Sequence, residues 1–111
     1  GGWRAPEEYR NDALTDKVDV WSLANNMYVV LTGDKPDLAD DDDVETSELI
    51  IKGKTGRLYP KYLEKDGPER ILAQIIQRCY QYDPSRRPTI FEIVKELEQG
   101  VHQVEQKLGI T

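Results

Sequence analysis

The stretch DKVDVWSLANNMYVVLTG, residues 16–33, decides the fold. Ten of the fourteen residues from 18 to 31 are apolar. Their side chains point in nearly every direction around a helical axis, which is typical of a helix buried in the centre of a domain. We therefore predict a helix that begins at Thr15 or Asp16, stops at Gly33 and is covered by its neighbours on all sides.

The segments around this helix indicate further helices and no convincing strand, so we predict an all-α fold. Pro6 suits the first turn of a short helix, and residues 47–52 have the pattern of another. The chain has 111 residues. That length fits one domain, for which we expect a radius of gyration near ~13 Å.

Two more helices are expected in the second half of the chain. One begins around Pro68 and ends at Asp83-Pro84, because the residue before a proline disfavours helix. In the other, Thr89 and Glu92 fit a capping box at the start, and residues 98–111 are expected to form a helical extension that Gly100 weakens. The predicted core consists of Trp21, Met27, Tyr28, Leu31, Ile75, Ile76 and Cys79.

The negative charge is concentrated in one loop. The chain has 15 basic and 21 acidic residues and a net charge of -6, and eight of the acidic residues fall between Asp34 and Glu48. Four adjacent aspartates, residues 40–43, repel one another and favour a solvated segment. We predict an acidic solvated loop over residues 34–46, with a basic-partner or cation site as the alternative. A calcium loop is excluded because the glycine required at its sixth position is missing.

Charge, hydropathy and cysteine usage exclude several classes of protein. An acidic chain without clustered Lys and Arg is a poor nucleic-acid or membrane-surface binder, and no run approaches the ~18–20 apolar residues of a membrane span. We therefore expect neither nucleic acid nor membrane as a partner. A single cysteine, Cys79, excludes an internal disulfide, so an intracellular, cytoplasmic location is expected. Because the sequence begins with Gly1 rather than Met, we expect a piece of a longer protein.

The motifs and residue types that usually indicate catalysis give only weak signals in this sequence. Gly53-Lys54-Thr55 imitates the end of a phosphate-binding loop, but the earlier glycine of that motif is missing. His102 is the only histidine and is expected to be an exposed helix residue, because a lone ligand closes no metal site. Cys79 lies among isoleucines, where a buried, unreactive thiol is expected and a reactive one is the alternative.

Three strings are more specific than these motifs. They are WRAPEEY at residues 3–9, DKVDVWSL at residues 16–23 with the following Leu31-Thr32-Gly33, and RCYQYDPSRRPT at residues 78–89. In this order and spacing they resemble the C-terminal lobe of a eukaryotic protein kinase, from its Ala-Pro-Glu motif onward. The resemblance implies that residues 1–111 are a partial protein kinase domain, with helices packed around the buried central helix.

The resemblance also implies roles for individual residues. Glu7 and Arg87 match the two partners of a buried ion pair that fixes the end of the activation segment to the helical core. Asp19 matches an aspartate that anchors the catalytic loop. The residues that match the substrate platform, next to the phosphoacceptor site, are Gly2, Trp3 and Arg4.

The catalytic parts of a kinase do not occur in these residues. The Gly-rich lid, the strand lysine, the His-Arg-Asp loop and Asp-Phe-Gly are all missing from the sequence. We therefore expect no catalytic residue, cofactor or metal site in the chain, while ATP and Mg²⁺ are implied for a parent enzyme that phosphorylates Ser, Thr or Tyr of a protein substrate. The implied partners are that substrate and the missing N-terminal lobe and catalytic loop. An inactive-kinase scaffold or a helical interaction module is the alternative, and a helix-turn-helix DNA binder is disfavoured by the charge.

Overall fold

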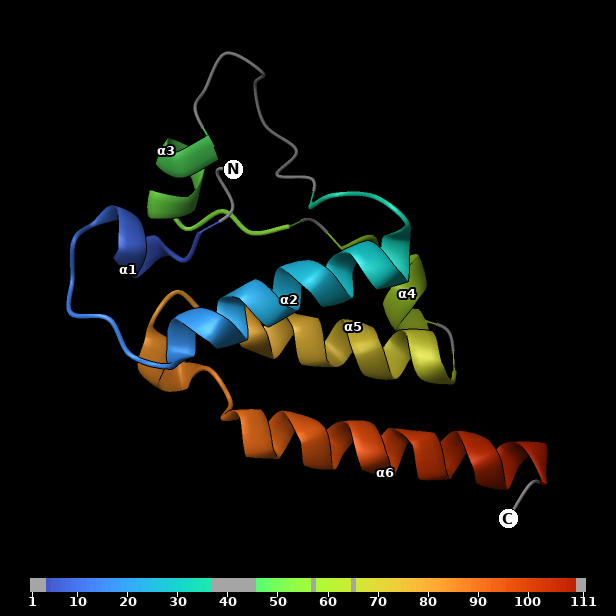
Figure 1. Cartoon of the computed structure of the whole chain (residues 1–111). Coiled ribbons are helices and arrows are strands. Elements are labelled where there is room, and N and C mark those ends of the chain that lie inside the picture. Colours follow the sequence, from blue (N-terminus) through green and yellow to red (C-terminus); the bar gives the residue numbers. More distant parts are fainter. Residues whose placement is uncertain (1–3, 37–45, 57, 65, 110–111) are drawn as a thin grey trace.

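The computed structural model describes residues 4–36, 46–56, 58–64 and 66–109, and this part of the chain is helical without any strand. Three long helices lie roughly alongside one another, with the short helices gathered at their ends (Figure 1). The all-α prediction is therefore confirmed. Of the predicted acidic loop, residues 37–45 lie outside the described residues. In chain order the elements are α1 (Pro6–Tyr9), α2 (Lys17–Thr32), α3 (Thr46–Ile51), α4 (Lys61–Glu64), α5 (Pro68–Cys79), the 3-10 helix η1 (Pro84–Arg86) and α6 (Ile90–Leu108).

Local signals set the two ends of α2 where the sequence predicts them. At the start, the hydroxyl oxygen of Thr15 accepts a hydrogen bond from the backbone N–H of Lys17 at 3.2 Å. At the end, Gly33 adopts a left-handed conformation with φ of 78°, and its N–H donates to the carbonyl of Val29 at 2.8 Å. Glycine reaches this conformation without steric strain, so the helix terminates there.

The expectation that α2 is covered on all sides is wrong. Its buried residues form one stripe, whereas Val29 is 45% and Val30 is 77% exposed. The reason is that the contacts of α2 with other helices are made chiefly to α5, with a smaller contact to η1, so its described neighbours cover one face only. Leu31, expected in the core, is only partly buried and packs against the core cluster from outside. The fully buried members of the stripe are Val20, Trp21, Ala24, Met27 and Tyr28.

Helix α5 runs antiparallel to α2 and supplies the other half of the core (Figure 1). Ile75, Ile76 and Cys79 are all buried. The helix ends at Cys79 rather than continuing to Asp83, which corrects the predicted boundary. The backbone leaves the helix early because the segment after Tyr80 turns to offer its carbonyls to a side chain of the site described below. The one-turn helix α4 was also not predicted, since four residues carry no readable period.

Helix α6 is a single continuous helix in which Gly100 is an interior residue. Its capping box is present: Thr89 Oγ1 accepts from the Glu92 N–H at 3.1 Å, and Glu92 Oε1 accepts from the Thr89 N–H at 3.4 Å. A methyl group at position 100 would lie 2.9 Å from Cγ2 of Ile71, so a side chain there would force a shift where α6 meets α5. The predicted extension over 98–111 is thus the second half of this helix up to 108, with residues 110–111 outside the described part.

The core is closed by aromatic and aliphatic side chains from α2, α3, α5 and α6, and by Ala5 and Tyr80, which lie next to helix ends. The Trp21 and Tyr80 rings meet edge to face with centroids 4.9 Å apart, and the Tyr80 hydroxyl donates to Asn25 Oδ1 at 2.6 Å. Ile50 from α3 and Ile93 from α6 complete the cluster. Within the described residues, no helix has the length and apolar character needed to cross a membrane.

Candidate functional site

The centre of the candidate site is an ion pair between Glu7 on α1 and Arg87, which follows η1. Arg87 Nη1 lies 2.6 Å from Glu7 Oε2, and Arg87 Nη2 lies 2.8 Å from Glu7 Oε1. The two residues are 1% and 2% exposed, so the pair is removed from water. Two parallel N–H···O bonds use the planar fork of a guanidinium fully, which a lysine cannot reproduce. The pair joins two segments that are 80 residues apart in the sequence.

Arg87 also donates to three backbone carbonyls. Its Nε donates to Gln81 O at 2.8 Å, Nη1 donates to Lys17 O at 3.0 Å, and Nη2 donates to Tyr82 O at 3.3 Å. A guanidinium has five N–H donors, and together with the two bonds to Glu7 all five are used. A buried charge needs such full satisfaction, since each unpaired donor carries a desolvation penalty.

The electrostatics of the pair favour its charged form. Burial by itself raises the pKa of Glu7. The hydrogen bond and positive charge of Arg87, together with a backbone hydrogen bond and the charge of Arg10, outweigh it, so the pKa lies below its ordinary value. On the other side, the Arg87 guanidinium lies over the Trp21 ring at 5.0 Å, a cation–π distance. Arg87 therefore connects α1, the start of α2 and the loop before α6 to the aromatic core.

Local hydrogen bonds position both partners. In α1, Pro6 occupies the first turn and Glu8 Oε2 accepts the Ala5 N–H at 2.8 Å, which holds the short helix that carries Glu7. Before Arg87, Asp83 Oδ1 accepts the Ser85 N–H at 2.9 Å and the Ser85 hydroxyl at 2.8 Å, which forms η1. These caps act within three residues, so the sequence alone encodes them.

Lys17 is a member of the site that the sequence analysis missed. Its Nζ donates to the Arg87 carbonyl at 2.6 Å, while its own carbonyl accepts from Arg87. The two residues are thereby linked in both directions across 70 positions. Lys17 belongs to the recognised DKVDVWSL string, but nothing in its local spacing indicates this contact.

Two other predicted site residues, Arg4 and Asp19, lie among the described residues, and neither is bonded to the ion pair. Arg4 is exposed, and its backbone N–H donates to the Tyr9 hydroxyl at 3.2 Å. Gly2 and Trp3, the rest of the predicted substrate platform, lie outside the described residues. Asp19 is exposed on the first turn of α2, so its carboxylate is open to solvent. Its predicted role as an anchor for a catalytic loop stays a prediction.

The structure also shows where the remaining residue types that can carry catalytic chemistry lie. Burial raises the pKa of the Cys79 thiol to about 11, which keeps it protonated and unreactive at neutral pH. His102 is an exposed α6 residue that pairs with Gln106. Gly53 and Lys54 follow the C-terminal end of α3, whereas a phosphate-binding loop precedes a helix. The described part of the chain holds no group of three or more His, Cys, Asp or Glu side chains arranged to bind a metal ion.

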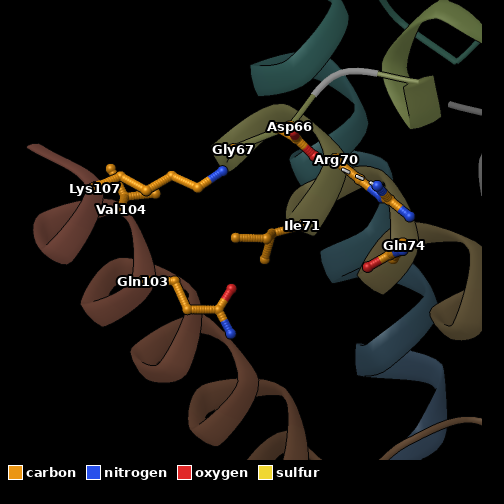
Figure 2. Close-up of a pocket in the computed structure, with 8 residues that line it drawn as sticks. All are labelled: Asp66, Gly67, Arg70, Ile71, Gln74, Gln103, Val104 and Lys107. Carbon is orange, nitrogen blue, oxygen red and sulfur yellow. Dashed lines mark ion pairs between the residues drawn. The ribbon is translucent and has the colours of Figure 1, made fainter.

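A polar hollow of about 280 Å³ lies between α5 and α6, away from the ion pair (Figure 2). Figure 2 shows Arg70 joined to Asp66, at 3.6 Å, and Lys107 reaching across from the opposite helix. Because the charge of Arg70 is already partnered and the hollow is open to solvent, we assign it no ligand.

Helix α1 is held against the α2–α5 pair by an arginine whose five N–H groups are all hydrogen-bonded. This arrangement is the one expected of the C-terminal, helical lobe of a protein kinase. The protein kinase domain family matches residues 1–97, so this chain belongs to that family. The twitchin kinase region of C. elegans has the same fold over 85% of this chain and 16% of its own, with a TM-score of 0.68 at 20% sequence identity.

Relatives by sequence include proteins that are named as serine/threonine-protein kinases. The RGS domain-containing serine/threonine-protein kinase A of Dictyostelium discoideum is 30% identical over 97% of this chain and 9% of its own length. Serine/threonine-protein kinase 12 of Arabidopsis thaliana is 34% identical over 93% of this chain and 22% of its own. The chain therefore spans less than a quarter of the length of either relative.

Proposed function

We propose that this chain is the structural and substrate-facing part of a longer protein kinase. This parent enzyme transfers the terminal phosphate of ATP to serine or threonine of a protein. The observation that carries the proposal is the bidentate Glu7–Arg87 pair. It holds the α1 segment at a set position on the helical core, and Arg4, next to α1, faces solvent where a substrate can reach it. The names of the two serine/threonine-protein kinases above support serine and threonine as the acceptor class.

In this proposal the chain supplies no chemical step. In protein kinases the lid, lysine, catalytic-loop and Asp-Phe-Gly motifs hold ATP and Mg²⁺. These motifs do not occur in these residues, so in this proposal ATP and Mg²⁺ are bound by other parts of the parent enzyme. The proposed partners are the protein substrate, the N-terminal lobe and the catalytic loop. We place the protein in the cytoplasm, which a single buried, unpaired cysteine supports.

Calorimetry and a transfer assay test the proposal together. We expect the 111-residue chain to show no heat of binding with ATP–Mg²⁺ and no phosphate transfer to a protein substrate. We expect a longer protein that contains the chain together with a His-Arg-Asp loop and Asp-Phe-Gly to do both. Tight ATP–Mg²⁺ binding by the chain alone, or a longer protein that carries these motifs and transfers no phosphate, would overturn the proposal.

A further inference from the structure

Tyr9 holds the backbone just before the helix that it ends. Its hydroxyl accepts a hydrogen bond from the backbone N–H of Arg4 at 3.2 Å. Beside this bond, Glu8 Oε2 accepts the N–H of Ala5 at 2.8 Å. Two consecutive backbone donors are therefore bonded to the last two side chains of α1, and these bonds fix the orientation of the planar peptide groups at Arg4 and Ala5.

The positions of Arg4 and Tyr9 indicate what the first of these bonds does. Ala5 is the N-cap of α1, so Arg4 directly precedes the cap and Tyr9 is the fourth helical residue. A contact between apolar side chains at these two positions commonly fixes the angle at which a chain enters a helix. In this chain a hydrogen bond to the backbone joins the same two positions. We therefore expect it to fix the entry angle at Arg4 directly.

The hydroxyl of Tyr9 is held in place from the other side by the core. The Tyr9 ring is partly buried and packs against the core cluster. A packed tyrosine ring is rigid and carries its polar group at the tip, so the position of the ring determines where the hydroxyl lies. Tyr9 thus connects the core to the backbone of Arg4.

Both hydrogen bonds are local in the sequence. They join residues that are five and three positions apart. They need no group from a more distant segment, so we expect a longer protein that contains this chain to keep them.

The ion pair and Tyr9 have different effects on the predicted substrate platform. The ion pair fixes where α1 lies on the helical core, because Glu7 is bonded to Arg87. Tyr9 fixes the orientation of the Arg4 backbone relative to α1. Loss of the ion pair therefore releases the whole α1 segment. Loss of the Tyr9 hydroxyl leaves α1 in place and releases only Arg4, the member of the predicted platform that lies among the described residues.

We propose that Tyr9 is a positioning residue for the protein substrate. Its hydroxyl orients the backbone of Arg4, and this orientation sets the preference for the substrate residue that follows the phosphoacceptor. This role rests on the proposed function, in which Arg4 belongs to the surface that meets the substrate. Tyr9 acts through Arg4 and touches no reacting atom, so it affects which substrates are accepted and not the transfer of phosphate itself.

The hydrogen bond itself is tested in the chain with a matched pair of variants. Tyr9→Phe removes the hydroxyl and keeps the ring. Tyr82→Phe is the control, because the Tyr82 hydroxyl also bonds a backbone group, the Ile51 carbonyl at 2.7 Å. Hydrogen exchange measured by NMR should show the Arg4 N–H exchanging about 3- to 10-fold faster in Tyr9→Phe, the factor that corresponds to one lost hydrogen bond, and at an unchanged rate in Tyr82→Phe. Circular dichroism verifies that both variants fold, and an unchanged Arg4 rate in Tyr9→Phe would overturn the proposal.

The effect on substrate choice is tested in a longer protein that contains the chain together with a His-Arg-Asp loop and Asp-Phe-Gly. Its substrate is a peptide mixture with serine or threonine at the centre and random residues at the other positions. In Tyr9→Phe the preference at the position after the phosphoacceptor should weaken by about 3- to 10-fold, with the other positions and the KM for ATP unchanged. Tyr82→Phe should keep the whole profile.

Two kinds of failure are distinguishable in this assay. An unchanged profile in Tyr9→Phe, an equal loss at every position, or the same change in both variants would overturn the role of Tyr9 while the protein still transfers phosphate. Absence of transfer by the unsubstituted protein would overturn the proposed function and, with it, the role of Tyr9.

Discussion

At the scale of single residues, the side chain of Arg87 links several distant parts of this protein. It pairs with Glu7, donates to three carbonyls and stacks on Trp21. A buried pair of this kind adds little net stability compared with apolar residues of the same shape, but the loss of one partner leaves a buried charge. The arrangement therefore acts as an all-or-none clasp between α1 and the core.

Removal of either partner is expected to be strongly destabilising. Glu7→Gln and Arg87→Met should each lower the free energy of unfolding by about 3–5 kcal/mol, because each leaves uncompensated buried groups. The double variant should lose less than the sum, since it leaves no lone charge. Urea denaturation followed by circular dichroism measures all three. Arg70→Met, which breaks the exposed pair with Asp66, is the control and should change stability by less than about 1 kcal/mol. Additive losses would contradict the clasp.

Stability is expected to fall in acid because of the same carboxylate. Burial opposes the charged form of Glu7, but Arg87 lowers its pKa overall below the ordinary 4.5. A lowered folded-state pKa gives stability that is present above 4.5 and is lost as the pH falls through the folded pKa. The urea midpoint of the chain should therefore drop more steeply below this pH than that of Glu7→Gln. Asp83, whose pKa is lowered by its hydrogen bonds with Ser85, leaves a residual slope in the variant. Parallel curves would refute the assignment.

At the scale of elements, the contact between α5 and α6 depends on a residue that weakens the helix carrying it. Gly100 lowers the helix propensity of α6 by ~1 kcal/mol relative to alanine. It is nevertheless buried, and the space a side chain would need is filled by Ile71. The packing of two helices, and not the stability of one, explains the residue.

The effect of substituting Gly100 on the free energy of unfolding should change sign when Ile71 is also substituted. Gly100→Ala is expected to destabilise the chain by about 1 kcal/mol, because overpacking of roughly 1–3 kcal/mol exceeds the gain of ~1 kcal/mol in helix propensity. In an Ile71→Ala background the collision is gone, so the same substitution should stabilise by up to ~1 kcal/mol. Urea denaturation of the four proteins closes the cycle. A stabilising effect in both backgrounds would show that α5 and α6 do not approach as closely as described.

At the scale of the whole molecule, the protein is more extended than its length predicts. Its radius of gyration is 15.0 Å, compared with the ~13 Å expected of a compact chain of this size, and its extents are 48 × 29 × 19 Å. The long α6, which reaches past the other helices in Figure 1, contributes to this shape. The outer face of α2, with Val30 at 77% exposure, adds apolar surface in contact with water.

Unfolding of the isolated chain is therefore expected to be weakly cooperative. A smaller share of its apolar surface is buried than in a compact domain, so the second half of α6 should separate from the α2–α5 core before the core melts. Differential scanning calorimetry should give a broad transition whose calorimetric enthalpy exceeds the van 't Hoff enthalpy. A single sharp transition at high temperature, with equal enthalpies, would contradict this expectation.

The sequence predicted two long-range features, the Glu7–Arg87 pair and the burial of α2, from different kinds of information. The pairing of Glu7 with Arg87 came from the family resemblance and not from the physics of either residue, since no local rule connects positions 80 residues apart. The burial of α2 on all sides was inferred from its composition and was wrong. Composition shows that apolar side chains surround the axis, but only the arrangement of neighbouring helices decides which of them are covered.

The amino-acid sequence by itself determined the helices with strong local signals. The ends of α2 at Thr15 and Gly33 and the capping box of α6 at Thr89 follow from hydrogen bonds within a few residues, so they can be read from the order of residues alone. Only the tertiary structure decided the end of α5, the place of Lys17 and the close contact at Gly100. Each of these depends on groups distant in sequence that meet only after the chain has packed, and no local period records such a meeting.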